Sequence, residues 1–412
     1  MMKVRGSMRL GSTLLFVLVS LVVAGLLVSP AFGVEPIRIG LVSPVSGNYG
    51  DHGALERAGM QIALDEYGGE VLGRPVTLIT ADSETNPDSA ARRARRLIEV
   101  DGVKFMMGAV SSSVATAIGA VAEEKNVLYI ATNGNSDTLT GKNARHNVFR
   151  SAPSMAILVR GGAKYVSDNL GKKWFFITHD YSWGHSGTRW ARNSMKKLGC
   201  TEVGEIKVPL GTRDFSSQLL QVRNSGADVL VITCAGFDNV ALMKQLAEYK
   251  IYDKMNVWYT LMEYVDMWPL DKKERQPYFM TEVYWNETPQ TRAWTENFAK
   301  KYPAAACPVL DNGSYNGWLS MKVLLEAIKK AGTADDVEKV ICAMEDLTVK
   351  DNMRATATWV RPWDHQFMTS VVLGRGNPKA EGTNIMEVKA IVPAIDVART
   401  KEENPVDVSC KK

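Results

Sequence analysis

Three consecutive serines follow an apolar run that has the composition of a buried strand. Ser111, Ser112 and Ser113 come directly after FMMGAV, and an amphipathic segment begins at Val114. A serine at the start of a helix caps it by accepting a hydrogen bond from a backbone N–H group, and one serine is enough for this. The N–H groups of the first helical turn, together with the helix dipole, also attract anions. The three adjacent hydroxyl groups therefore favour a carboxylate site over a simple helix cap.

Two further loops offer groups to the same site. The stretch ATNGNSDTLT follows the next apolar run, and its small polar residues form either a plain turn or a second set of donors to the anion. The loop SPVSGNYGDHG follows the first apolar run and places Tyr49 at the rim as a flat wall, although a single loop tyrosine is more often a packing residue. Ligands of open parallel sheets bind beyond the carboxyl ends of the strands. We therefore expect the three loops to meet there.

No motif for catalysis or metal binding stands out in the sequence. GHSG lacks the spacing of a G-x-S-x-G nucleophile loop, and GNSDTLTGKN lacks the spacing of a phosphate-binding loop. His179 and His185 flank DYSWG without an obvious third metal ligand. We expect no catalytic residue, no metal and no cofactor. A secreted hydrolase with Ser112 or Ser186 as its nucleophile is a remote alternative.

Short apolar runs alternate with helical patterns in two successive series. The predicted strands lie at residues 37–44, 75–82, 104–110 and 126–132, and then at 172–180, 202–209, 228–236 and 256–260. Helical periodicity fills the segments between them. Strands that alternate with helices favour parallel sheets covered on both faces. The sequence predicts an α/β fold of two doubly wound parallel-sheet lobes.

The last third of the chain departs from this alternation. Helical patterns lie at residues 291–302, 315–332 and about 335–344, and strands are predicted at 355–360, 367–373 and 386–392. Helices that follow two finished sheets must cover one of them from a distance, so we expect the chain to return to the first lobe through a hinge of several strands. The predicted boundaries are a first lobe of residues 34–153 and 286–357, and a second lobe of residues 154–285 and 358–412.

Composition and charge exclude several classes of protein. With 412 residues, 45% of them hydrophobic and 23% charged, the chain is globular and has room for two domains. Lys3, Arg5 and Arg9 lie in the first 33 residues, so the remainder carries 46 basic and 45 acidic residues. That balance gives no concentrated basic surface, and we expect no nucleic-acid partner.

Residues 1–33 have the layout of a secretory signal peptide. A basic start precedes the apolar stretch LLFVLVSLVVAGLLV, and Pro30 and small residues lead to a predicted cleavage after Gly33. The alternative is an uncleaved membrane anchor, but a spanning helix needs about 20 apolar residues. The first cysteine is Cys200, so no thiol near the cleavage site could carry a lipid. We expect export to the periplasm.

All five cysteines lie at or after residue 200, without a C-x-x-C pair. Export permits disulfides, and an odd count leaves at least one thiol unpaired. Pairing of Cys200 with Cys234, or of Cys307 with Cys342, stays open.

Taken in order, several stretches resemble the branched-chain amino-acid binding proteins, the type I periplasmic receptors that feed ABC importers. These stretches are IRIGLVSPVSGNYGDHGALERAGMQIALDE, GAVSSSVATA, HDYSWG, FSSQLLQVRNSGADVLVIT and RPWDHQ. The resemblance covers essentially residues 36–400. It implies a monomer that closes around a small solute by a hinge motion and then docks on a membrane permease.

The resemblance also assigns the loop residues of the first lobe. Ser112 and Ser113, with Ser111 beside them, match positions that bind the ligand's carboxylate. In the next loop, Asn133 and Asn135 fall where the family gives a backbone amide and a threonine hydroxyl to the same group. Tyr49 matches the family's aromatic wall.

In the second lobe, the resemblance points to aromatic residues and one acid. Tyr181 and Trp183 align with an aromatic that covers the ligand after closure, and Phe237 aligns with another. Glu263 sits where amino-acid receptors place the carboxylate that pairs with the ligand's ammonium group. The many aromatic residues favour a large apolar or flat ligand. The implied ligand is a hydrophobic or aromatic amino acid; the alternative is a sensory or transport receptor for aromatic acids, amides or urea.

Overall fold

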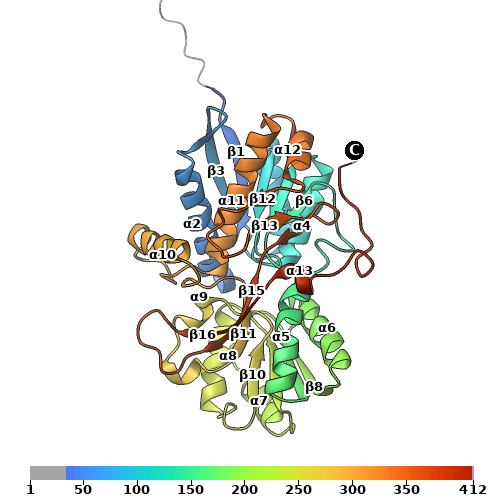
Figure 1. Cartoon of the computed structure of the whole chain (residues 1–412), viewed down its shortest axis with the longest axis vertical. Coiled ribbons are helices and arrows are strands. Elements are labelled where there is room, and N and C mark those ends of the chain that lie inside the picture. Colours follow the sequence, from blue (N-terminus) through green and yellow to red (C-terminus); the bar gives the residue numbers. More distant parts are fainter. Residues whose placement is uncertain (1–33, 411–412) are drawn as a thin grey trace, which may run out of the picture. The chain divides into compact units, whose positions relative to one another are not determined.

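The computed structural model describes residues 34–410 of the chain (Figure 1). Every helix and strand of the described residues belongs to one compact unit that begins at Pro36. The predicted signal peptide, residues 1–33, lies outside them. No helix within residues 34–410 has the length and apolar character that a membrane crossing requires.

The first lobe is built on a six-stranded sheet in the order β2-β3-β1-β4-β5-β6. Its strands are β1 (Ile37–Ser43), β2 (Glu70–Val71), β3 (Arg74–Asp82), β4 (Phe105–Gly108), β5 (Leu128–Ala131) and β6 (Val148–Arg150). All neighbours pair in parallel except the short edge strand β2 with β3. Strands β4 and β5 are buried along their whole length, as their continuous apolar runs predict.

The second lobe is built on a seven-stranded sheet in the order β16-β15-β11-β10-β9-β7-β8. Its strands are β7 (Lys173–His179), β8 (Thr201–Val208), β9 (Val229–Thr233), β10 (Asn256–Tyr259), β11 (Tyr278–Thr281), β15 (Val371–Gly376) and β16 (Met386–Val392). The five strands from β8 to β11 pair in parallel, and β15 and β16 add antiparallel strands at one edge. The predicted α/β class of two parallel-sheet lobes is confirmed.

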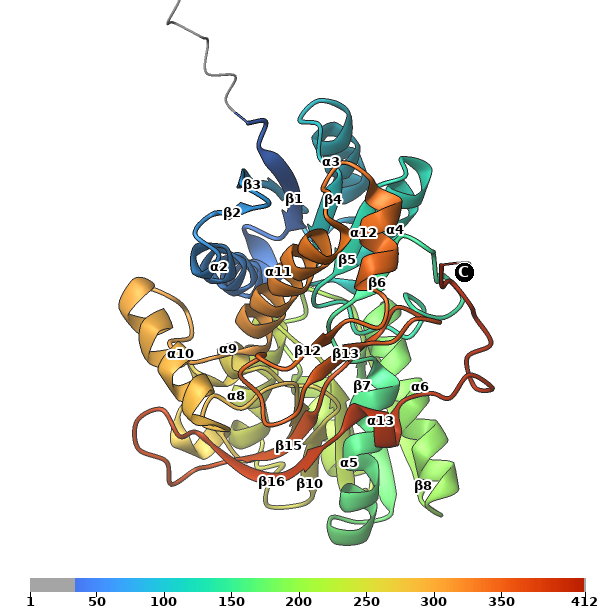
Figure 2. The same cartoon turned by 45° about the horizontal axis from the view of Figure 1, so that its top comes forward.

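Helices cover both faces of each sheet (Figure 2). Those within the first 260 residues are α2 (Gly50–Glu66), α3 (Pro87–Glu99), α4 (Ser112–Glu124), α5 (Met155–Asn169), α6 (Ser182–Lys197), α7 (Ser216–Arg223) and α8 (Phe237–Glu248), with the 3-10 turn η1 (Gly47–Tyr49). In the first lobe α3 packs against α4, while α2 packs against the later helix α11. Apolar side chains fill the space on each face, so the sheets are the centres of the core.

The last third of the chain supplies elements to both lobes. Its elements are α9 (Tyr264–Met267), η2 (Lys272–Glu274), α10 (Pro289–Lys301), α11 (Asn312–Ala331), α12 (Val337–Met344), β12 (Thr348–Val349), β13 (Thr358–Val360), β14 (Phe367–Met368) and α13 (Ala394–Val397). Strands β12, β13 and β14 form a small third sheet. In Figure 2 the orange helices α11 and α12 lie against the blue and teal first lobe, as predicted for a returning chain. The exact lobe boundaries stay a prediction.

One disulfide joins the C-terminal segment to helix α12. It links Cys342 and Cys410, which are 68 residues apart in the sequence. Cys200, Cys234 and Cys307 are free and buried. Both pairings that the sequence left open are therefore wrong, because the fold brings the C-terminal segment back to α12 and leaves the other three thiols inside the apolar core.

Candidate ligand site at the carboxyl ends of the strands

The predicted site residues follow the carboxyl ends of parallel strands in both sheets. Strands β1, β4 and β5 lead into the loops of the first lobe, and β7, β9 and β10 lead into those of the second. The two sets meet directly, because the hydroxyl oxygens of Tyr49 and Tyr181 lie 2.9 Å apart. The fold thus assembles a candidate site from both lobes.

The three serines occupy the beginning of α4. Ser111 is the N-cap residue, but its side chain makes no capping hydrogen bond. The Ser112 hydroxyl accepts a hydrogen bond from the backbone N–H of Ser136 at 3.1 Å and so holds the neighbouring loop. Ser113 is half-buried, and within residues 34–410 its hydroxyl has no hydrogen-bond partner. The amides of the first turn and two of the hydroxyls are therefore available to an anion.

The two asparagines of the next loop contact carboxylates of the protein itself. Asn133 donates from Nδ2 to Glu56 Oε1 at 3.0 Å. Asn135 donates from Nδ2 to Glu282 Oε1 at 2.7 Å. Asn316, on α11, donates to Asn133 Oδ1 at 2.9 Å and to Glu282 Oε2 at 2.5 Å. The side-chain amides of this loop are thus engaged by buried acids.

Sequence reasoning missed both of these acids. Glu56 is fully buried on α2, where burial raises the pKa of its carboxyl group even though Ser43 and Thr132 also donate hydrogen bonds to it. Burial raises the pKa of Glu282 to about 7, against the opposing effect of its two amide donors. The sequence indicates the burial of Glu56 only through its position, directly after Leu55 on the inward face of a predicted helix.

Glu263 lies within a second group of acids. It is the N-cap residue of α9, half-buried, with Asp266 one turn further along and Asp311 at the start of α11. Burial raises the pKa of Glu263 well above its ordinary value; the nearby carboxylates of Asp311 and Asp266 raise it further, while His52 lowers it. Within residues 34–410 no side chain donates a hydrogen bond to the Glu263 carboxyl group.

His52 supplies the positive charge of this group. It lies on α2 one turn before Glu56 and is only 3% exposed. Its Nε2 is 3.3 Å from Oδ1 of Asp266. Burial disfavours the imidazolium form, but Glu263, Asp266 and Asp311 outweigh it and raise the pKa of His52 to about 10. His52 was not predicted from the sequence, although its spacing from Glu56 places both residues on one helix face.

Of the predicted aromatic residues, Tyr49 and Trp183 are buried, Tyr181 is half-buried and Phe237 is exposed. Tyr181 and Trp183 stack with ring centroids 6.1 Å apart, and Tyr49 meets the His52 ring edge-on at 5.5 Å. Phe237 is 41% exposed, with the guanidinium of Arg213 over its ring. The rings of Tyr49, Tyr181 and Trp183 therefore gather beside the acids, while Phe237 lies at the surface.

Neither candidate nucleophile has the environment of a catalytic serine. The Ser186 hydroxyl donates to Oδ2 of Asp137 at 2.8 Å, and the Ser112 hydroxyl holds a backbone amide. Among the described residues no histidine ring hydrogen-bonds to either serine. Nothing in this arrangement supports the hydrolase alternative.

Fold and site together define a two-lobed solute receptor, and comparison with known proteins gives its family. The periplasmic binding protein family matches residues 36–382, so the chain belongs to that family. Its members are the substrate-binding components of ABC importers and are periplasmic.

Individual relatives support this assignment. The chain is 29% identical over 331 residues to a Leu/Ile/Val-binding protein homologue of Brucella suis biovar 1, covering 76% of this chain and 82% of that protein. The solved structure of a periplasmic binding protein from Burkholderia mallei superimposes with a TM-score of 0.84 at 26% identity, covering 90% and 98% of the two chains. A solute-binding protein of Rhodopseudomonas palustris, solved with benzoate, shares the fold with a TM-score of 0.78 at 19% identity, over 87% and 97% of the chains.

Proposed function

We propose that the protein captures an amino acid with a hydrophobic or aromatic side chain and delivers it unchanged to the permease of an ABC importer. The observation that carries this proposal is the Glu263 carboxyl group, which is half-buried and has no hydrogen-bond donor among residues 34–410. A ligand ammonium group would supply the missing donor and add a second positive charge to that of His52. A charge-assisted hydrogen bond of this kind is stronger than one between neutral groups.

The other end of the ligand is assigned to the start of α4. The side-chain amides of Asn133 and Asn135 already bind Glu56 and Glu282, so the remaining donors on this side are the first-turn amides and serine hydroxyls. A ligand carboxylate at this helix N-terminus would be stabilised by the helix dipole. The rings of Tyr181 and Trp183 would then bury the ligand's side chain.

Export, oligomeric state and the permease belong to the same proposal. The N-terminal segment is inferred to be a cleaved signal peptide that delivers a monomer to the periplasm. Assignment to the periplasmic binding protein family supports this proposal. We also infer that no reaction is catalysed, since homologues of the chain are solute-binding receptors.

Calorimetry with related ligands tests which protein groups bind the carboxylate and the ammonium group of the amino acid. Phenylalanine and leucine carry both charged groups, phenylalaninamide lacks the carboxylate, and 3-phenylpropionate lacks the ammonium. We expect the intact amino acids to bind tightest. Glu263→Gln should weaken their binding by roughly 10- to 100-fold, the range that corresponds to a lost hydrogen bond to a charged group.

Glu66→Gln is the control, because Glu66 is a solvent-exposed acid of α2 that instead accepts a hydrogen bond from Trp318 Nε1 at 2.8 Å. It should leave ligand affinity unchanged. Equal affinity of the wild-type protein and Glu263→Gln for phenylalanine would overturn the proposed role of Glu263.

A second candidate ligand is an aromatic acid without an ammonium group. It is favoured by the raised pKa of Glu263, because a neutral carboxyl group can donate a hydrogen bond to a carboxylate or phenol oxygen. In that case benzoate or 3-phenylpropionate binds more tightly than phenylalanine. The same measurements include amides and urea. Tighter binding of either one than of phenylalanine would support an amide receptor instead.

A further inference from the structure

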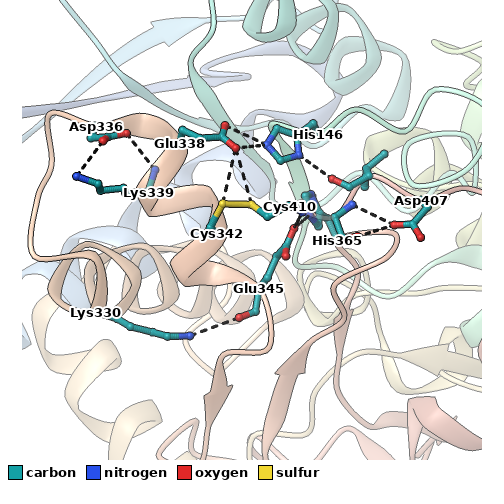
Figure 3. The surroundings of a disulfide bond; sticks show 12 residues. His146, Lys330, Asp336, Glu338, Lys339, Cys342, Glu345, His365, Asp407 and Cys410 are labelled. Carbon is teal, nitrogen blue, oxygen red and sulfur yellow. Dashed lines mark hydrogen bonds and ion pairs between the residues drawn. A yellow bond between two sulfur atoms is a disulfide. The ribbon is translucent and has the colours of Figure 1, made fainter. Parts of the chain in front are cut away.

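Three kinds of metal-binding side chain, none of them assigned to the ligand site, meet on the surface beside the disulfide (Figure 3). His146 Nε2 lies 2.9 and 3.0 Å from the two carboxylate oxygens of Glu338. Glu338 Oε1 lies 3.7 Å from Sγ of Cys342 and 3.9 Å from Sγ of Cys410. The ligand atoms of His146, Glu338 and Cys410 all lie within 4.8 Å of one another.

The surrounding contacts orient these groups independently of the disulfide. The Nδ1 atom of His146 is 2.7 Å from the carbonyl oxygen of Val408. A hydrogen bond from Nδ1–H to a carbonyl is the usual support of a metal-bound histidine, and it leaves Nε2 for the metal. Glu338 and Cys342 are four residues apart on α12, so their side chains share one face of the helix.

Hydrogen bonds of the backbone, in addition to the disulfide, hold Cys410 in position. Its backbone N–H donates to Oε1 of Glu345 at 2.7 Å, and the N–H of Val408 donates to the carbonyl of Trp363 at 3.1 Å. These bonds would keep the Cys410 thiol near α12 after the disulfide is broken. Tetrahedral zinc with N and S ligands at its usual bond lengths places ligand atoms about 3.3 to 3.8 Å apart. Glu338 Oε1 already lies 3.7 and 3.9 Å from the two sulfur atoms, which must themselves move apart once their bond is broken.

We infer that reduction of the Cys342–Cys410 disulfide converts this cluster into a zinc site with two thiolates, the His146 imidazole and the Glu338 carboxylate as ligands. A dithiol reductant supplies two electrons and two protons: the S–S bond breaks, two S–H bonds form, and the dithiol becomes its own disulfide. Zinc binding then forms two Zn–S bonds and releases the two thiol protons to solvent. Two cysteines, one histidine and one carboxylate are a donor set suited to tetrahedral zinc.

A reductant and a cation can both reach the cluster. Glu338 and Cys342 are exposed, and His146 is half-buried. A surface cavity of about 320 Å³ is lined by His146 and Glu338 together with Glu123 and neighbouring residues. Reducing conditions would thus exchange a covalent attachment of the C-terminal segment for a metal-ion attachment at the same place.

Competitive titration of Zn²⁺ against a chromophoric chelator tests the inference on the full chain. The protein is assayed with its disulfide intact and after reduction by a dithiol that is then removed without oxygen. We expect one Zn²⁺ per reduced chain, bound at least about 100-fold more tightly than by the oxidised chain, and protection of both thiols from alkylation. His146→Ala and Glu338→Gln should each weaken binding at least about tenfold, the loss that even an outer-shell mutation produces.

Two variants serve as controls for the metal ligands. His185 is another exposed histidine paired with a carboxylate, Asp180 at 2.7 Å, so His185→Ala should leave zinc affinity unchanged. Cys200→Ser removes a buried free thiol and should also have no effect. Equal zinc binding by the oxidised and reduced chains would overturn the inference, as would full binding by reduced, folded His146→Ala.

Discussion

The hydroxyl oxygens of Tyr49 and Tyr181 lie 2.9 Å apart and join the first lobe to the second. Tyr49 ends the turn that follows β1, and Tyr181 is the N-cap residue of α6, directly after β7. Both rings lie beside residues that we propose to bind the ligand. Because this hydrogen bond joins the two lobes directly, we expect it to stabilise the closed state of the proposed hinge motion.

Tyr181→Phe should weaken ligand binding about fivefold. A hydrogen bond contributes about 1 kcal/mol on average, and this one is lost when the lobes separate. Isothermal calorimetry with the best ligand measures the change. The control is Tyr252→Phe, which removes a hydrogen bond from the Tyr252 hydroxyl to the carbonyl of Glu274 inside the second lobe. If both variants lose affinity equally, the contact between Tyr49 and Tyr181 does not contribute to closure.

His52→Ala should lower the free energy of unfolding by about 3 to 5 kcal/mol at pH 7. The substitution removes the cation from a buried group and leaves the Asp266 carboxylate, 3.3 Å away, without its partner. Urea denaturation measures the loss. His185→Ala breaks the exposed pair with Asp180 and should change stability by less than about 0.5 kcal/mol. A similarly small effect in His52→Ala would show that the buried carboxyl groups are neutral without it.

The wild-type protein should lose stability as the pH rises from 6.5 towards 10, in part because of His52. Its pKa is about 10 in the folded protein and 6.5 as the ordinary value, so the folded state holds a proton that the unfolded state has released. Stability falls with pH wherever the folded state binds more protons. Urea denaturation at pH 7, 8 and 9 measures this slope, and His52→Ala should flatten it. An unchanged slope would mean that His52 is not the group that titrates.

Glu282 gives a second contribution in a more acidic window. Its pKa is about 7 in the folded protein against an ordinary value of 4.5, so stability should fall as the pH rises from 4.5 to 7. The contribution of this one group is at most about 3 kcal/mol. Urea denaturation of the wild-type protein and of Glu282→Gln at pH 5, 6 and 7 isolates the contribution of Glu282. The other buried acid, Glu56, is present in both proteins and contributes to both. If the free energy of unfolding changes with pH in the same way in both proteins, Glu282 does not contribute to the pH dependence.

Most of the strands could be predicted from local patterns, but the short strands β2, β6, β11 and β12 were missed and one predicted strand is divided. The predicted strand at residues 367–373 is two strands, β14 (Phe367–Met368) and β15 (Val371–Gly376). β14 belongs to the small third sheet, whereas β15 belongs to the sheet of the second lobe. At Thr369 and Ser370 the chain passes from the small third sheet to the sheet of the second lobe. Apolar periodicity shows that a segment is buried, but it does not show in which sheet.

The site was predictable only where its residues follow a strand. Tyr49, Ser112 and Glu263 follow strands and could be proposed as site residues from the sequence. His52 and Glu56 lie within α2. The role of a charged residue on the inward face of a helix cannot be inferred from the sequence until its partners are known. Those partners come from β1, β5 and α9, far apart in the sequence. Long-range pairing of polar groups is therefore what the sequence did not show.

The position of α2 depends on two glycines in its contact with α11. A Cβ atom on Gly59 would lie 1.9 Å from the carbonyl oxygen of Ser314, and one on Gly317 would lie 2.1 Å from the carbonyl oxygen of Glu56. Because both obstacles are backbone atoms of the facing helix, the helices must move apart to admit a methyl group. That movement would displace His52 and Glu56, which α2 presents to the site.

Gly59→Ala should therefore destabilise the protein by about 2 kcal/mol or more and weaken ligand binding as well. Gly119→Ala is the matched control, since Gly119 lies within helix α4 and the nearest atom to its added Cβ would be a Val148 methyl carbon 3.5 Å away. That variant gains helix propensity of up to about 1 kcal/mol and should keep its affinity. Urea denaturation and calorimetry measure both quantities. A stability loss in Gly59→Ala without a loss of affinity would show that the contact between α2 and α11 supports the fold but does not position His52 and Glu56 for the ligand.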